Sequence, residues 1–256
     1  MKKNLLLFAV FIFVLIQPSI AQVDQSPEVG VIEHLGETIP LDLKFVNEKS
    51  ETVTLRQLIN KPTILSFVYF DCPGLCSPLL EGVGDVIKKT SLELGKDYQV
   101  ITFSFNYRDT PQKAKEKKDR FVERYSKGKG DGWIFLTTDS TTIFDITHKT
   151  GFITKAVGLD FVHPSAIIAV SPSGKITRYL YGINFLPNDF KLAIIEADKG
   201  QARPTIQKIM LMCYSYDPEN KRFALDVTKI AGTIIIFFLL VFAIVYLIKP
   251  KKKNKN

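Results

Sequence analysis

Two apolar stretches of strand length alternate with amphipathic segments in the middle of the chain. Residues 63–70 and 98–105 show no polar alternation, which predicts strands that are buried on both faces of a sheet. Apolar residues recur at helical spacing over residues 76–94, and a Thr-Pro start predicts a basic helix over residues 111–125. Strands that alternate with helices indicate βαβ units and a parallel sheet.

Shorter predicted elements flank this centre on both sides. Residues 39–46 and 52–55 alternate apolar and polar side chains around a polar turn, which predicts a β-hairpin. The later part of the chain predicts a strand at 133–136, a helix at 141–150 that ends at Gly151, a hairpin of 166–170 with 176–180, and a helix at 189–198. This order predicts an α/β, thioredoxin-like fold with an N-terminal β-hairpin extension, and we expect one such domain over residues 35–200.

The N-terminal segment, residues 1–21, has the layout of a secretory signal peptide. Two lysines precede an uncharged run over residues 5–16, and residues 19–21 resemble a small-residue cleavage site. We therefore expect the chain to be exported, with residues 1–21 either cleaved or kept as an anchor. A segment with little periodicity, residues 22–34, is expected to be a linker.

The C-terminal segment predicts a membrane anchor. Residues 230–248 form a run of nineteen residues without a charge. At about 1.5 Å per residue, a helix of this length crosses a hydrocarbon core of about 30 Å. Five lysines in the tail, residues 249–256, place the C-terminus in the cytoplasm. We expect a single-pass cell-membrane protein with its domain on the exported, extracytoplasmic side and a connector over residues 201–229.

The formal net charge of +8 does not indicate a nucleic-acid-binding protein. Seven lysines belong to the predicted signal peptide and tail, which leaves little basic charge for the domain. Basic residues between Lys113 and Lys129 alternate with acidic ones at a helical period, which is typical of a solvated helix face. No aromatic interleaving and no nucleic-acid module accompany them, so we exclude that class.

Two of the three cysteines, Cys72 and Cys76, form a CxxxC pair between the first buried strand and the following helix. Backbone N–H groups and the helix dipole at a helix start stabilise a thiolate. Three interpretations are open: a structural disulfide, a redox-active dithiol, or a two-point ligand for a soft metal ion. Two thiolates with one imidazole suit Cu(I), whereas zinc would want a fourth ligand.

His163 is the best-placed histidine to complete a metal site. It lies directly before the predicted hairpin at 166–180, which a thioredoxin fold places beside the strand-to-helix junction. Taken alone, a histidine in a loop is more often a surface residue. His148 lies on a predicted helix and His34 in the predicted linker, so both are expected to be incidental, although a flexible linker could bring His34 near the site.

Four segments in this order and spacing resemble the Sco/SenC family. They are residues 70–78 (FDCPGLCSP), 107–111 (YRDTP), 163–166 (HPSA) and 171–176 (SPSGKI). The resemblance covers about residues 35–198. The CxxxC after an aromatic strand is fairly specific, and the downstream histidine before a Pro-x-Gly hairpin makes the match strong.

The resemblance implies a thioredoxin-like protein that carries copper to the binuclear copper centre in subunit II of cytochrome c oxidase, or keeps the cysteines of that centre reduced. By position, Cys72, Cys76 and His163 would hold one copper ion, as Cu(I) or Cu(II). The alternative is a thiol-disulfide oxidoreductase that acts on exported partner proteins, with Cys72 and Cys76 as its catalytic thiols. A peroxiredoxin-like peroxidase is disfavoured because Asp71 directly precedes Cys72.

This sequence departs from the family pattern in three places. Asn106 and Tyr107 stand where Asp-Pro often precedes the RDTP segment, and the anchor is C-terminal where familiar members use an N-terminal helix. Pro164 follows the histidine and could occupy the place of the cis-proline of thioredoxin folds, which would favour the redox alternative. None of these changes removes a predicted ligand.

The third cysteine, Cys213, lies outside the family match, just before the predicted membrane segment. A buried, inert cysteine is the plain interpretation. The alternative is that Cys213, with Met210 and Met212, forms a second soft contact for copper or a resolving thiol.

Overall fold

The computed structural model describes most of the predicted domain and short pieces of the C-terminal region. The described residues are 29–71, 76–125, 130–158, 160–203, 214–217, 222–225, 235, 238, 239, 241 and 242. The predicted signal peptide, the segment 72–75 with Cys72, and Cys213 lie outside these residues, as does most of the predicted membrane segment. The side chain of Cys76 is also outside the description.

A central pair of parallel strands organises the domain. Every residue of β4 (Thr63–Val68) and β5 (Gln99–Ser104) is buried. The two strands pair in parallel from Thr63 opposite Gln99 to Val68 opposite Ser104. The two apolar runs therefore form strands covered on both faces, as the sequence predicts.

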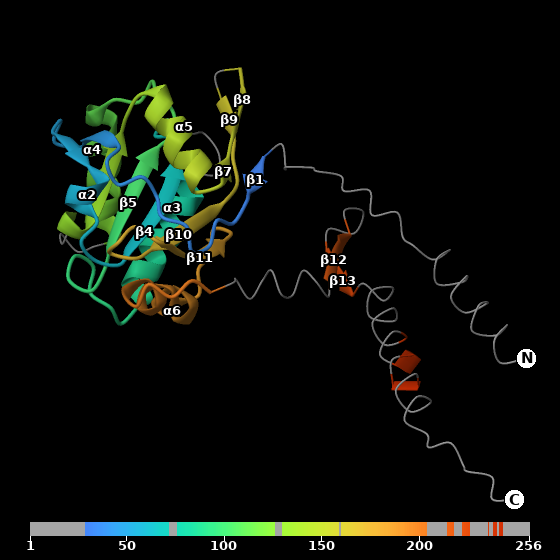
Figure 1. Ribbon diagram of the computed structural model, residues 1–256. Helices are drawn as coiled ribbons and strands as arrows, with labels where there is room; N and C mark the ends of the chain where they lie inside the picture. The colour runs from blue at the N-terminus through green and yellow to red at the C-terminus, as the bar shows by residue number, and fades with distance from the viewer. Residues whose placement is uncertain are drawn as a thin grey trace, which may run out of the picture.

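The main sheet has seven strands in the order β11-β10-β4-β5-β6-β2-β3 (Figure 1). β4, β5 and β6 run parallel, and the four remaining strands join antiparallel, two at each side. The bounds of the outer strands are β2 Lys44–Asn47, β3 Thr52–Thr54, β6 Trp133–Thr137, β10 Ala166–Val170 and β11 Ile176–Tyr181. This mixed α/β arrangement places the carboxyl ends of β4 and β5 at the same edge of the sheet.

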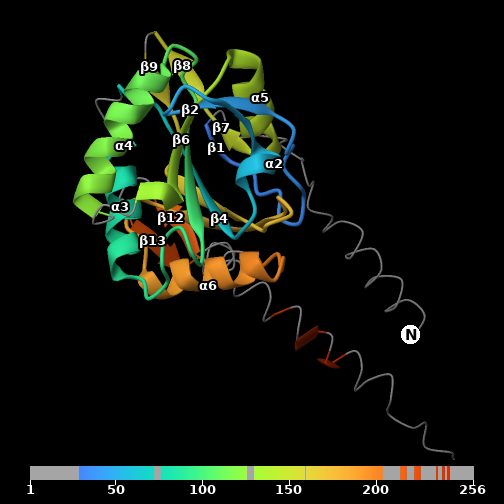
Figure 2. The same ribbon diagram turned by 90° about the vertical axis from the view of Figure 1, so that its left-hand side faces the viewer.

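Helices cover both faces of this sheet. Figure 2 shows α3 (Cys76–Lys89) and α4 (Pro111–Tyr125) on one side and α5 (Ser140–Lys149) on the other. α6 (Pro187–Asp198) packs against β11 and touches α3. Two shorter helices are α2 (Leu55–Leu58) and the 3-10 helix η1 (Gly130–Gly132).

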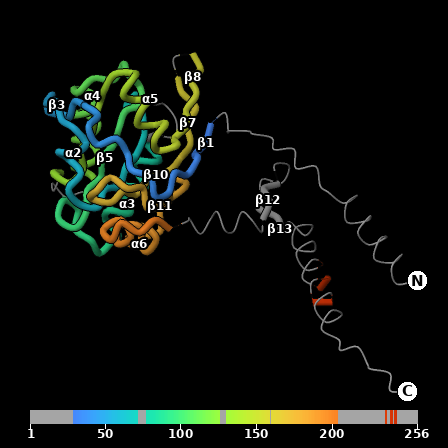
Figure 3. Tube along the Cα trace, viewed as in Figure 1, coloured from blue at the N-terminus to red at the C-terminus, as the bar shows by residue number. Residues whose placement is uncertain are grey.

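Several short strands differ from the sequence prediction. β1 (Gly30–Val31) pairs antiparallel with β7 (Phe152–Ile153), so the expected linker over residues 22–34 gives way to ordered pairing at Gly30. Figure 3 shows β1 beside β7 along the trace. The backbone of Ile32 then donates to the Gly151 carbonyl at 2.9 Å.

A second unpredicted feature is the hairpin of β8 (Lys155–Val157) and β9 (Asp160–Val162), which projects beyond the sheet (Figure 1). All three residues of β8 are exposed, so the strand has no alternation of buried and exposed side chains that the sequence could reveal. Two boundaries also shift: the N-terminal hairpin begins at Lys44 rather than residue 39, and α3 ends at Lys89 rather than residue 94.

The C-terminal region contributes only fragments to the description. β12 (Tyr214–Asp217) and β13 (Arg222–Leu225) form an antiparallel pair inside the predicted connector. Among the described residues, none of the helices has both the length and the apolar character to span a membrane. Residues 230–248 lie largely outside the description, so the membrane anchor stays a prediction, as does the signal peptide at residues 1–21.

The two glycines of α3 are explained by close packing. A Cβ atom added at Gly82 would lie 1.7 Å from the Ile183 carbonyl oxygen, and one added at Gly84 would lie within 2.7 Å of ring atoms of Tyr125. Glycine lowers helix propensity by about 1 kcal/mol relative to alanine. Here its absent side chain lets α3 approach the chain after β11, which outweighs that cost.

We expect Gly82→Ala to destabilise the protein although alanine is the better helix former. Overpacking a well-packed site costs about 1–3 kcal/mol, which exceeds the propensity gain of about 1 kcal/mol. Urea unfolding of the two forms measures the difference. Asp85→Ala, at an exposed position of the same helix, is the matched control and should not lose stability; equal effects for both variants would contradict the packing argument.

Candidate metal centre

The predicted cysteine segment spans the junction between β4 and α3. After β4 the chain continues through Phe70 to Asp71, and Cys76 is the first residue of α3. The first backbone N–H groups of an α-helix have no partner within the helix, and they carry partial positive charge. The backbone therefore places Cys76 where a thiolate is stabilised, as the sequence predicts.

His163 lies at the same edge of the sheet. β10 pairs antiparallel with β4, and Ile167 lies opposite Ser66. Beyond these paired residues the two segments stay close, because the His163 ring centroid lies 6.4 Å from that of Tyr69, the residue that follows β4. The structure thus brings the predicted histidine to the strand end that leads into the cysteines.

Aromatic side chains from β7 and from the residues just after β4 and β5 surround the His163 imidazole. Its ring centroid lies 5.1 Å from that of Phe105 and 6.4 Å from that of Phe152, which is stacked on it. Tyr69 approaches edge-on at 6.4 Å. The histidine is only 8% exposed, so it is a buried residue rather than the surface residue that a loop position alone suggests.

The protonation state of His163 follows from this burial. Desolvation lowers the pKa of His163, and the hydrogen bond to the Pro164 carbonyl opposes this with a smaller effect. The Nδ1 atom lies 2.9 Å from the Pro164 oxygen. A carbonyl oxygen only accepts, so Nδ1 carries the proton and Nε2 keeps its lone pair. Neutral imidazole is a common metal ligand in proteins, and a hydrogen bond from its second nitrogen, such as the one from Nδ1 here, fixes the orientation of the ring.

Pro164 itself does not take the expected cis form. Within the described residues no peptide bond is cis, so the bond between His163 and Pro164 is trans. Pro164 therefore lacks the cis peptide bond of the thioredoxin proline, and whether it takes the place of that proline stays a prediction.

Charged side chains hold the chain just before the cysteines. The Phe70 N–H donates to Asp109 Oδ2 at 2.8 Å, and the Lys117 ammonium donates to the Phe70 carbonyl oxygen at 3.0 Å. Asp71 forms an ion pair with Lys113. Since Phe70 lies beyond the paired residues of β4, these side chains replace the hydrogen bonds that a neighbouring strand would supply.

The expectation of a solvated basic helix is wrong for part of α4. Lys117 is 7% exposed, and Lys118 pairs with Glu48, whose side chain is also 7% exposed. Lys115, in contrast, lies in solvent and pairs with Asp119. The helix therefore has both a solvated side and a side that turns ammonium groups inward.

The β8–β9 hairpin lies against the same region. Tyr69 donates to Asp160 at 3.3 Å, and the Arg108 guanidinium lies 5.9 Å from the Phe161 ring centroid. Phe161 also packs on Tyr69 with 5.5 Å between their ring centroids. A segment that the sequence does not predict as a hairpin therefore forms part of the wall around His163.

The other candidate residues are placed elsewhere or outside the description. His34 Nδ1 lies 3.1 Å from the Lys149 carbonyl at the end of α5, and His148 stacks on Phe144. Both histidines belong to local packing, as expected. Cys213 lies outside the described residues, so its role stays open.

The donor set fits a soft metal ion by its chemistry. Among the described side chains, no three His, Cys, Asp or Glu residues come together as a ligand group. Both cysteine side chains fall outside that search, so the ligand set of Cys72, Cys76 and His163 stays a prediction. The structure places the neutral imidazole of His163, held in one orientation, beside the end of β4 that leads into the two cysteines.

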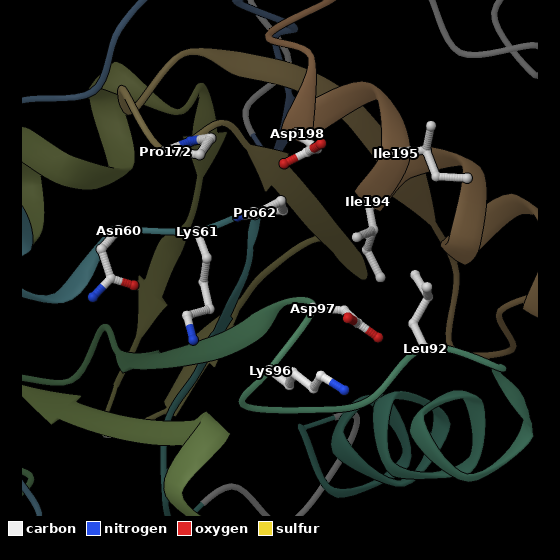
Figure 4. Close-up of a pocket in the computed structure, with 10 residues that line it drawn as sticks. All are labelled: Asn60, Lys61, Pro62, Leu92, Lys96, Asp97, Pro172, Ile194, Ile195 and Asp198. Atoms are coloured by element: carbon white, nitrogen blue, oxygen red, sulfur yellow. The ribbon is translucent and has the colours of Figure 1, made fainter.

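A groove of about 410 Å³ lies at the opposite end of the parallel strands (Figure 4). Its lining includes Lys61 and Asp97, which precede β4 and β5, whereas the CxxxC segment follows β4. Lys61 donates to the Gly95 carbonyl at 2.6 Å, and Lys96 pairs with Glu93. The ammonium groups of Lys61 and Lys96 are therefore paired within the protein. The groove is separate from the candidate metal centre.

A mixed α/β sheet with three central parallel strands, with a CxxxC segment between a central strand and a helix and a buried histidine beside that strand end, is the arrangement of a thioredoxin-like protein. The family model described as SCO1/SenC matches residues 34–190. The chain belongs to the SCO1/SenC family, and the resemblance in its motifs is confirmed.

Individual relatives agree with this assignment. The SCO1 protein homolog of Bacillus subtilis (strain 168) is 27% identical over 150 residues, which cover 57% of this chain and 75% of the relative. A crystal structure of a candidate electron transfer protein from Aquifex aeolicus VF5 is 32% identical, with a TM-score of 0.58, and covers 64% of this chain and 95% of its own. Arabidopsis thaliana ScoI, solved with copper bound, has a TM-score of 0.50 at 21% identity, covers 64% of this chain and 98% of its own, and shares the fold.

We expect the stability of the metal-free protein to fall at low pH because of His163. Its pKa is ordinary, about 6.5, in the unfolded chain and lowered in the folded one. Below pH 6.5 the unfolded chain therefore binds more protons, and stability present above that pH is lost as pH falls through the lowered pKa. Urea unfolding between pH 7.5 and about 5 should show a smaller loss for His163→Gln than for the wild type. Parallel losses in both proteins would argue against a buried neutral ring.

Proposed function

We propose that this protein is a copper metallochaperone that holds one copper ion through Cys72, Cys76 and His163. The observation that supports the proposal is the His163 imidazole, buried, fixed through Nδ1, and beside the strand end before the cysteines. A buried histidine with no ligand role would more simply be an apolar residue. A neutral imidazole whose Nδ1 carries the proton can offer the lone pair of Nε2 to a metal ion.

The donor set suits transfer of a metal as well as binding. Two thiolates and one imidazole favour Cu(I) at low coordination. An open coordination position lets a ligand of the acceptor protein bind before the chaperone ligands leave. Copper is thus the cargo of the protein, and the chain supplies soft ligands with a defined orientation.

The acceptor that we propose is the binuclear copper centre in subunit II of cytochrome c oxidase. Membership of the SCO1/SenC family supports this choice, and Arabidopsis ScoI, which shares the fold, was solved with copper bound. A chain exported by residues 1–21 and anchored by residues 230–248 would present the domain outside the cytoplasm, with its C-terminus inside.

A second candidate function is thiol-disulfide exchange on an exported protein. The observation that favours it is the position of Cys76 at the first residue of α3, because a helix N-terminus stabilises the attacking thiolate. In that reaction one thiolate attacks a target disulfide, and the other resolves the mixed disulfide. The same two cysteines would serve both functions.

Anaerobic Cu(I) titration of the reduced, full-length protein tests the metallochaperone function. We expect one tightly bound equivalent in the wild type and its loss in Cys72→Ser, Cys76→Ser and His163→Ala, because each variant removes one predicted ligand. His148→Ala is the control, since that ring stacks on Phe144. Unchanged Cu(I) affinity in His163→Ala would show that the ligand assignment is wrong.

The same His163→Ala protein separates the two functions. Dithiol exchange uses only the cysteines, so His163→Ala should reduce a small disulfide substrate at close to the wild-type rate. A wild type that exchanges readily and binds no Cu(I) tightly would establish the redox enzyme instead.

Cys213 is expected to play no part in the copper site. Cys213→Ser should bind the same single equivalent of Cu(I) as the wild type, because the three predicted ligands already satisfy a low-coordinate ion. Metal analysis after gel filtration gives the stoichiometry. A fall in bound copper would instead support the soft contact formed with Met210 and Met212.

A further inference from the structure

Three charged side chains at four-residue spacing lie just before the start of α4 and along its first turns. We refer to Asp109, Lys113 and Lys117 as the charged stripe. The Asp109 side chain is fully buried, Lys117 is 7% exposed, and Lys113 is partly exposed. A lysine on a helix normally extends its ammonium group into water, so the burial of Lys117 requires a specific reason.

Lys117 contacts the chain on both sides of the CxxxC segment. Its ammonium donates to the Phe70 carbonyl oxygen at 3.0 Å, two residues before Cys72. It also donates to the Ser77 hydroxyl oxygen at 3.5 Å, one residue after Cys76. One ammonium group therefore links the strand end that enters the cysteine segment to the first turn of the helix that leaves it.

Other charged side chains lie beside this link. Lys113 pairs with Asp71 and lies 3.8 Å from Asp109 Oδ1. Arg108 also acts on Lys113 electrostatically, so the charged groups around Lys113 and Lys117 are two carboxylates, two ammonium groups and one guanidinium. Lys117 is the buried cation among them.

We propose that Lys117 is a positioning residue for the copper centre. It holds the two flanks of the cysteine segment together and supplies the fixed positive charge that the loaded centre needs. Cu(I) bound by two thiolates and a neutral imidazole carries one net negative charge, whereas the metal-free dithiol carries none when protonated. A buried cation beside the site therefore favours the loaded form. This inference rests on the metallochaperone function proposed above.

The test is a Cu(I) competition titration with a colorimetric chelator on the full-length protein. Lys117→Met removes both the charge and the donor, and Lys117→Arg keeps both. Lys115→Met is the matched control, because Lys115 lies in solvent on the same helix and pairs with Asp119. For a charge near the site, the expected loss of Cu(I) affinity in Lys117→Met is about tenfold or more, with recovery in Lys117→Arg and no change in Lys115→Met.

Thermal unfolding of each metal-free variant identifies a variant that does not fold. If Lys117→Met is unfolded, Lys117→Gln takes its place, because glutamine retains a donor without the charge and should also weaken binding. Wild-type affinity in Lys117→Met or Lys117→Gln overturns the inference and leaves the metallochaperone function intact. Equal losses in Lys117→Met and Lys117→Arg also overturn it, since they indicate disturbed packing rather than lost charge. Absence of tight Cu(I) binding by the wild type would instead refute the proposed function itself.

Discussion

The backbone of Phe70 is the constraint on which the candidate centre depends. A parallel sheet satisfies the backbone groups of β4 only as far as its neighbours extend, and Phe70 lies past that limit. Asp109 accepts its N–H and Lys117 donates to its carbonyl oxygen. Unsatisfied backbone groups in a buried position each cost about 1–3 kcal/mol, so these two side chains allow the chain to leave the sheet in a buried, defined direction. The cysteine segment therefore begins from a backbone position that these two hydrogen bonds fix.

The sequence predicts the centre of the fold well, because its signals there are strong and local. The apolar runs of β4 and β5 have no polar alternation, and Pro111 marks the start of α4. Interactions between distant short segments are harder to predict. Gly30 and Val31 form a strand only because Phe152 lies beside them, and two residues carry no periodicity from which to detect this.

The candidate site likewise has residues that the sequence predicts and features that it does not. His163 and the two cysteines are found from motif order, since each lies next to a predicted strand. The tautomer and the burial of His163 cannot be predicted in this way, because the aromatic side chains around it come from segments that are distant from one another in the sequence. Lys117 was predictable in principle: it falls at helical spacing between Ala114 and Phe121, both of which are buried. Its charge favoured a solvent position, whereas the spacing favoured the core, and the spacing was the better guide.

The aromatic enclosure of His163 has a consequence for the order of events in ligand exchange. Rings of Phe105, Phe152 and Tyr69 leave the imidazole little room to rotate, and the bond to Pro164 holds its far side. In the proposed centre, the histidine would therefore keep its place during ligand exchange, and a ligand of the acceptor would approach from the side that these rings leave open.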